Sequence, residues 1–298
     1  MIKSFADLMT EAKAKGPKKV AVAVAQDEVV LEALDMARRE KIAEPLLFGD
    51  KQAIEQAAQK AKVSLAGWDV TDIKDMPEAS RAAVAAVKSG KADFLMKGLV
   101  ATSTFLKAVL DKEVGLRTGR LLSHVAVMEM PGYHKIFLLT DGGMCVKPDL
   151  AAKMDIVGNA VDVAHKMGIE QPKVALLAAV EVVNPEMPET ADAAELSKMA
   201  ERGQLKGCVV DGPLALDLAV SEEAARHKKV KSAVAGDADI MVAPEIACGN
   251  VLAKGLIYMG GAKAAGLIAG AAKPVVMLSR SDSKEQKLNS IALGVVSC

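Results

Sequence analysis

The chain has 298 residues, enough for one large domain or for two lobes of ordinary size. Its 38 basic and 38 acidic residues balance, so no overall field favours nucleic acid or an anionic membrane, and an anionic ligand needs a local site. Hydrophobic residues make up 51 % of the chain but aromatic residues only 3 %, a composition typical of helices packed on a parallel sheet through small aliphatic side chains.

The N-terminal stretch MIKSFADLMTEAKAKG predicts an amphipathic helix and not a signal peptide. No apolar run approaches the length needed to span a membrane. The four cysteines form no C-x-x-C pair, which favours reduced thiols. The four histidines share no ligand spacing, so no metal site is expected. We therefore expect a soluble cytoplasmic protein without a bound metal.

Short β-rich runs alternate with helical patterns along most of the chain. This alternation predicts an α/β fold in which a mostly parallel sheet is covered by helices on both faces. The expected strands are 18–25, 44–50, 92–98, 172–180, 206–214, 238–245 and 273–279. The first two precede expected helices at 27–41 and 51–61, and the third follows an expected helix at 77–90.

One region departs from this alternation. The runs 119–130 and 135–141 are joined only by PGYH, which predicts a hairpin and an antiparallel pair. A mixed sheet, or a second lobe that begins near here, accounts for it, with the polar segment 111–119 as a hinge. The glycine-rich stretch 260–266 matches no nucleotide-binding motif and falls within helical patterns, so we assign it no ligand.

Three strands end in small or hydroxyl residues that precede a helix. They lead into Leu99–Thr104, into IACGN before a helix that starts near Val251, and into Ser279–Ser283 before a helix at 284–294. In open α/β sheets ligands bind beyond the carboxyl ends of the strands, and a helix N-terminus favours an anion. Ordinary helix capping, at about 1 kcal/mol for each cap, is the alternative interpretation. Arg280 favours the anion site, because a guanidinium can bind phosphate through two parallel hydrogen bonds.

Other polar positions are less specific. Asp211, Gly212 and Pro213 end the strand-like run 206–214, and Asp217 opens the next helix. Turn formation and capping explain these residues as well as catalysis does. The Gly-Gly turn in TDGGMCVKPD (140–149) has two interpretations: it brings the backbone close to a ligand, or it is only a tight turn.

Four motifs in sequence give a more specific indication. KGLVATSTFLKAVL (97–110), VVDGPLALDLAVS (209–221), GDADIMVAPEIACGN (236–250) and LSRSDS (278–283) together resemble the phosphate acetyl/butyryltransferase family. The resemblance covers essentially the whole chain, in the right order, and is strongest to the butyryl branch. It implies an α/β fold of two lobes similar to that of isocitrate and isopropylmalate dehydrogenases. The implied lobes are 1–125 plus 273–298 and 126–272, with the active site in the cleft between them.

The implied reaction is acyl-CoA plus phosphate giving acyl phosphate plus CoA, with butyryl as the expected acyl group. CoA and phosphate are substrates, and no metal or redox cofactor is bound. The resemblance also implies a dimer or larger homo-oligomer that binds neither nucleic acid nor membrane. We expect direct transfer in a ternary complex, because no cysteine needs to act.

The site residues are carried over from the matching motifs. Two positions depart from the acetyltransferase pattern: Lys107 replaces an arginine, and Gln286 falls where an aspartate is proposed to take the thiol proton. The general base therefore stays open. The expected catalytic residues are Ser279, Arg280, Asp282, Glu285 and Asp217. The expected phosphate- and CoA-binding residues are Thr102, Ser103, Thr104, Lys107, Asp211, Gly212, Pro213, Glu245, Gly249 and Asn250.

Three alternatives stay open at this point. The first is acetyl transfer, because one methylene in a pocket is worth only about 1–3 kcal/mol and short motifs decide chain length poorly. The second is a metal- and NAD-dependent decarboxylating dehydrogenase of similar fold, for which we find no cluster of aspartates and arginines. The third is a non-catalytic relative, which Ser279, Arg280 and the Gly249-Asn250 pair argue against.

Overall fold

The chain forms two compact α/β units. The computed structural model describes residues 1–277, 279 and 281–298. Unit 1 comprises Met1–Phe5 and Leu121–Ala264, and unit 2 comprises Ala6–Arg120 and Ala265–Cys298. The boundaries at 121 and 265 fall before the expected ones at 126 and 273, and Met1–Phe5 groups with the unit opposite to the expected one. The expected cleft stays a prediction. Within the described ranges, no helix combines the length and the apolar character needed to cross a membrane.

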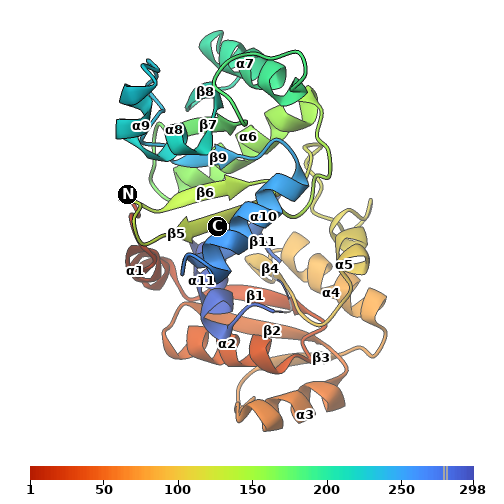
Figure 1. The fold of residues 1–298 in the computed structure, drawn as a ribbon. Coiled ribbons are helices and arrows are strands. Elements are labelled where there is room, and N and C mark those ends of the chain that lie inside the picture. Colours follow the sequence, from red (N-terminus) through yellow and green to blue (C-terminus); the bar gives the residue numbers. More distant parts are fainter. Residues whose placement is uncertain (278, 280) are drawn as a thin grey trace. The chain divides into compact units, whose positions relative to one another are not determined.

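Unit 2 is built on a mostly parallel sheet with the strand order β3-β2-β1-β4-β11-β10 (Figure 1). Of its described pairs, β10–β11 is antiparallel and the others are parallel. Its elements are α1 (Phe5–Lys15), β1 (Lys18–Ala23), α2 (Glu28–Arg39), β2 (Ala43–Gly49), α3 (Lys51–Ala61), β3 (Asp69–Asp72), α4 (Met76–Lys88), β4 (Phe94–Lys97), α5 (Thr102–Val109), β10 (Lys263–Ala269), β11 (Val275–Val276) and α11 (Lys284–Val296).

Local sequence explains why the helices of unit 2 begin where they do. Asp27, Asp50 and Asp75 precede α2, α3 and α4, and each side chain accepts a backbone N–H from the first turn. Such a cap contributes about 1 kcal/mol. In β1, which precedes α2, residues 20–23 are apolar and fully buried. The predicted β-α alternation is thereby confirmed for this unit.

Unit 1 has the strand order β5-β6-β9-β7-β8. The β5–β6 pair is antiparallel, which confirms the hairpin predicted from PGYH, and the other pairs are parallel. Its elements are β5 (Ser123–Glu129), β6 (Phe137–Thr140), α6 (Leu150–Lys166), β7 (Lys173–Leu177), α7 (Pro188–Glu201), β8 (Val209–Leu214), α8 (Leu216–Val220), α9 (Glu222–His227), β9 (Ile240–Val242) and α10 (Ile246–Tyr258).

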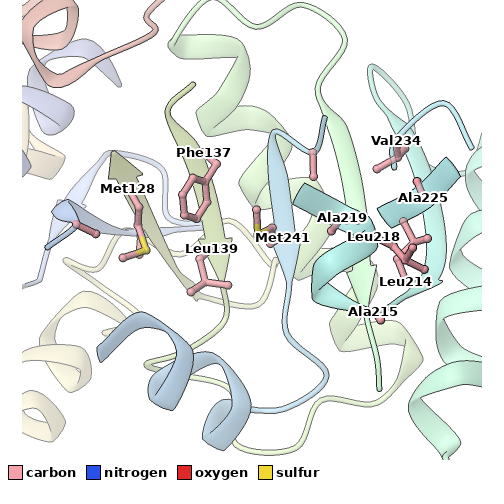
Figure 2. Close-up of a cluster of buried hydrophobic side chains, with 14 residues drawn as sticks. Met128, Phe137, Leu139, Leu214, Ala215, Leu218, Ala219, Ala225, Val234 and Met241 are labelled. Carbon is pink, nitrogen blue, oxygen red and sulfur yellow. The ribbon is translucent and has the colours of Figure 1, made fainter. Parts of the chain in front are cut away.

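A core made mostly of alanine, leucine and methionine side chains holds unit 1 together. Figure 2 shows Met128, Leu139 and Met241 on β5, β6 and β9, and Leu218 and Ala225 on α8 and α9. Methionine adapts its shape to irregular gaps, so such a core packs well with few aromatic rings. Full burial of one such large side chain contributes about 1.5–3 kcal/mol.

Two expectations from the sequence were wrong. Residues 263–269 form strand β10, although the stretch was assigned to a helical pattern; a run of small apolar residues does not distinguish a buried strand from a buried helix. The helix expected near Val251 begins at Ile246, so Gly249 and Asn250 lie in its first turns. Asp211, Gly212 and Pro213 lie near the end of β8, as expected.

Candidate active site

In unit 2, the carboxyl ends of β1, β4 and β11 lie side by side at one edge of the sheet. The strands are parallel neighbours, so the segments that follow them emerge together. Gly98 and Leu99, just after β4, donate backbone hydrogen bonds to the carbonyl oxygens of Ala23 and Val24, at 2.9 and 2.7 Å. A Cβ at Gly98 would overlap the Val24 carbonyl oxygen, so glycine allows this close approach.

The segment after β4 starts helix α5 with a free N-terminus. Its N-cap is Ala101, whose side chain cannot accept a hydrogen bond. Thr102, Ser103 and Thr104 form the first turn, where Thr102 and Ser103 are exposed and Thr104 is half-buried. The capping interpretation of these hydroxyl residues is therefore wrong for α5. The exposed Lys107 lies four residues after Ser103, on the same face of the helix.

The segment after β11 forms a tight turn around Ser279. The Ser279 N–H donates to the Asp282 carboxylate at 2.8 Å, and the Ser279 hydroxyl lies 2.9 Å from that of Ser281. Ser283 then caps α11: its hydroxyl accepts the Gln286 N–H while the Gln286 side chain accepts the Ser283 N–H. Arg280, the residue on which the sequence argument depends most, lies outside the described residues.

The exposed Glu285 lies in the first turn of α11. Hydrogen bonds from its own backbone N–H and from Ser283 lower the pKa of its carboxyl group. A carboxylate with a lowered pKa is a weaker base than an ordinary one. Of the expected bases near Ser279, Asp282 makes the turn, and Glu285 is a weaker base than an ordinary glutamate.

Two buried lysines at this edge were missed from the sequence. Lys97 ends β4 and is 6 % exposed, and its Nζ lies 3.4 Å from the Gly98 carbonyl oxygen. Lys287 of α11 is 3 % exposed, and its Nζ donates to the Ser279 carbonyl oxygen at 3.0 Å. The sequence did contain an indication of this burial, because both lysines fall at positions where the strand or helix pattern otherwise places buried apolar residues. Lysine is almost never fully buried unless it is paired.

In unit 1, the buried Asp141 organises the loop that follows β6. Its carboxylate accepts the backbone N–H groups of His124, Gly143, Met144 and Cys145 at 2.6–3.3 Å. The side chain is 2 % exposed, and these donors offset the cost of burying its charge. Asp141 thus converts the Gly-Gly stretch into a defined turn, a role that sequence reasoning did not assign.

This loop contacts the start of α10. The Asn250 side-chain amide donates to the Gly142 carbonyl oxygen at 2.9 Å. A Cβ at Gly249 would lie 2.5 Å from the Asp141 carbonyl oxygen, so only glycine fits there without a shift. Glu245, the N-cap of α10, is exposed, and its side chain does not cap the helix. The predicted Glu245, Gly249 and Asn250 thus lie together.

The remaining predicted residues lie at the end of β8. The Asp211 carboxylate accepts the Gly212 N–H at 2.9 Å, and a Cβ at Gly212 would lie 2.6 Å from Leu176 Cβ. Pro213 is buried. Asp217, in the first turn of α8, is half-exposed and lies 3.4 Å from the Lys228 ammonium. In the structure, Gly212 serves strand packing, whereas Asp217 stays accessible.

A small pocket opens in unit 1 at the carboxyl ends of β7 and β9. Lys153 of α6 is buried there and pairs with Asp192 of α7 at 2.6 Å. Neither Lys153 nor Asp192 was expected as a site residue from the sequence. The lining residues are Lys153, Leu176, Leu177, Glu189, Asp192, Ala193, Leu196, Val242, Ala243 and Pro244.

Asp237, which matches a motif of the resembling family, lies before β9 and so at the opposite edge of the unit 1 sheet. Its carboxylate contacts His134, Lys135 and Lys173 at 2.7–2.8 Å. Burial alone would raise the pKa of Asp237, but hydrogen bonds from Lys135, Lys173 and His134 outweigh it and hold the pKa far below its usual range. This ion-pair network is structural, because ligands bind at the carboxyl edge.

Comparison with known proteins agrees with the motif pattern. The model of the phosphate acetyl/butaryl transferase family matches residues 4–82 and 74–295. Phosphate butyryltransferase of Clostridium acetobutylicum is 53 % identical over 99 % of this chain and 98 % of its own, and phosphate acetyltransferase of Thermotoga maritima is 48 % identical over 97 % and 98 %.

A solved structure gives the same result. A branched-chain phosphotransacylase from Enterococcus faecalis V583 superposes with a TM-score of 0.84 at 37 % identity, covering 94 % of this chain and 98 % of its own. The resemblance inferred from the four motifs is therefore confirmed. The chain belongs to the phosphate acetyl/butaryl transferase family.

Proposed function

We propose that this chain catalyses the reversible exchange of a short-chain acyl group between CoA and phosphate, with butyryl as the preferred group. The observation that carries the proposal is the uncapped N-terminus of α5 at the same sheet edge as the Ser279 turn. The names of the Clostridium and Thermotoga relatives support the reaction class.

The phosphate is assigned to the first turn of α5. Free N–H groups and the helix dipole favour an anion there, and the hydroxyls of Thr102, Ser103 and Thr104 add donors. Lys107 shares the face of Ser103, and helical side chains incline toward the N-terminus. Lys107 then contributes a point charge, where an arginine would offer two parallel hydrogen bonds.

In the proposed reaction a phosphate oxygen attacks the thioester carbonyl carbon. The C–O bond forms, the C–S bond breaks, and CoA leaves as a thiolate that takes up a proton. In reverse, CoA must lose its thiol proton, because a thiol with a pKa near 8.5 is only a few per cent ionised at pH 7. Ser279 and Arg280 are assigned to the carbonyl oxygen, which gains negative charge; loss of one such donor typically slows the reaction about 10²- to 10³-fold.

The thiol proton is assigned to one of three carboxylates. Asp282 accepts the Ser279 N–H, Glu285 has a lowered pKa, and Asp217 lies near Lys228. Replacing each in turn by its amide separates them. The base is the one whose loss removes the acid limb of the pH profile for acyl-CoA synthesis while the fold is retained.

We propose direct transfer within a ternary complex. Burial and the Asp141 carboxylate raise the pKa of the Cys145 thiol to about 12, so this cysteine is a poor nucleophile at neutral pH. Initial rates with both substrates varied should give intersecting lines. Parallel lines together with an isolable acyl-protein would contradict direct transfer.

The exposed face of α10 supports a homodimer, which we propose as the assembly. Val251, Tyr258 and the adjoining Met259 are 71 %, 66 % and 90 % exposed, a large apolar exposure for one helix. A second copy is the proposed occupant. Val251→Asp should convert a dimer to a monomer in light scattering, whereas a monomeric unmodified protein would contradict the proposal.

We also propose a cytoplasmic location.

Acetyl transfer is the second candidate, supported by the Thermotoga maritima relative at 48 % identity. A difference of two methylenes is worth about 2–6 kcal/mol at 1–3 kcal/mol each, so the ratio of kcat/KM for butyryl-CoA and acetyl-CoA separates the candidates.

A matched pair of lysines tests the phosphate assignment. Lys107→Gln should raise the KM for phosphate about tenfold with little change in the KM for acyl-CoA, because only phosphate contacts this charge. Lys112→Gln, a change of an exposed lysine five residues on, should leave both values unchanged. Equal effects of the two variants would contradict the assignment of phosphate to α5.

A further inference from the structure

Lys287 is a buried charged group to which the proposed reaction assigns no role. It lies in the first turns of α11 and is 3 % exposed. Burying an ammonium group is costly unless it is paired and hydrogen-bonded. Its surroundings should therefore show why the chain keeps a lysine at this position.

The lysine side chain reaches back to the turn that precedes its own helix. Its Nζ donates to the Ser279 carbonyl oxygen at 3.0 Å. The carboxylates of Asp282 and Asp27 are close enough to affect its titration. Asp27 caps α2, and α2 packs against α11 (Figure 1). Lys287 is therefore close to the segment that follows β1 and to the segment that follows β11.

Two side chains bind the backbone of Ser279, one at its N–H group and the other at its carbonyl oxygen. The Asp282 carboxylate accepts its N–H at 2.8 Å, and the Asp282 N–H and Lys287 Nζ both approach its carbonyl oxygen, at 3.3 and 3.0 Å. That carbonyl belongs to the peptide group that joins Ser279 to the next residue in the chain. The contact therefore restrains the orientation of the Ser279 backbone.

We propose that Lys287 is a positioning residue for acyl transfer: through the Ser279 carbonyl oxygen it fixes the turn that presents the Ser279 hydroxyl. It does not contact the substrate in this role. The inference rests on the proposed function and assigns one further residue, Lys287, to the proposed active site. Burial lowers the pKa of Lys287 more than Asp282 and Asp27 raise it, which is consistent with a group enclosed by the turn.

A purely structural role makes a different prediction. If Lys287 only filled space, its replacement by methionine, which has a similar length, would leave the rate unchanged. If it only stabilised the fold, its loss would lower the melting temperature and leave the specific activity of the folded protein unchanged. A positioning role instead lowers kcat while KM for both substrates changes little, because misplacing a reacting group affects the transition state most.

The experiment compares Lys287→Met, Lys287→Arg and Lys284→Met in phosphate-dependent thiol release from butyryl-CoA. Lys284 is exposed and lies one helical turn earlier, so its variant is the matched control. We expect Lys287→Met to lower kcat roughly tenfold or more, with both KM values within about twofold and an unchanged melting temperature. Lys287→Arg keeps charge and donors and should recover part of the rate.

Each outcome decides a separate question. An active wild type with an equally active Lys287→Met variant would overturn the positioning role and leave the proposed function intact. A wild type without phosphate-dependent release would instead overturn the proposed function. If Lys287→Met does not fold, Lys287→Gln takes its place; a Gln variant that folds and matches the wild-type kcat would contradict the proposal.

Discussion

The side-chain amide of Asn250 donates a 2.9 Å hydrogen bond to the carbonyl oxygen of Gly142. This bond joins the first turns of α10 to the loop after β6. The buried Asp141 accepts hydrogen bonds from backbone N–H groups of that loop, so its carboxylate and the Asn250 amide together fix the loop against α10. Gly249 of α10 packs so closely against this loop that a side chain at this position would meet the Asp141 carbonyl oxygen.

Gly249→Ala should destabilise the protein by about 1–3 kcal/mol, because the new Cβ would lie 2.5 Å from the Asp141 carbonyl oxygen. Gly255→Ala is the matched control in the same helix, with nothing within 4 Å of its new Cβ. That change should stabilise the protein by up to about 1 kcal/mol, the helix preference of alanine over glycine. Urea unfolding measures both, and equal effects would contradict the close packing.

Cys145 should resist alkylation while the exposed Cys248 reacts. Burial first, and then the Asp141 charge, raise the pKa of the Cys145 thiol to about 12, so about one molecule in ten thousand is thiolate at pH 8. Mass spectrometry after iodoacetamide treatment checks the order of labelling. Labelling of Cys145 as fast as that of Cys248 would contradict the enclosed environment.

Asp237 should contribute to stability in neutral solution and lose that contribution in acid. Its pKa in the folded protein lies below the unfolded value of about 3.9, so the unfolded state binds more protons as the pH falls through that value. The stabilisation is complete above the unfolded pKa and decreases below it. Asp237→Asn should flatten the pH dependence of the unfolding free energy between about pH 5 and 3. An unchanged slope would contradict the ion-pair network.

The sequence predicted those parts of the fold that local patterns determine. The strands 18–25 and 92–98, the hairpin at PGYH and the start of α11 follow from apolar periodicity, turn residues and a capping serine. The strand at 263–269 was missed because its alanine- and glycine-rich run has no distinguishing period.

The candidate site was predicted only where motifs mark it. The positions of Ser279 and of the α5 first turn at one sheet edge followed from the strand ends. Lys287 and Asp141 were missed because their burial depends on segments that tertiary packing brings to them. The structural role of Asp237 was available from the sequence, since this residue precedes its strand and so lies at the edge away from ligands.

The most direct test of the central claim is thiol release from acetyl-, propionyl-, butyryl- and valeryl-CoA, with and without phosphate, for the wild type and Arg280→Ala. We predict release that requires phosphate, is fastest with the four-carbon chain, and falls by about 10²- to 10³-fold in the variant. No phosphate-dependent release with any chain length, or full activity of Arg280→Ala, would contradict the account.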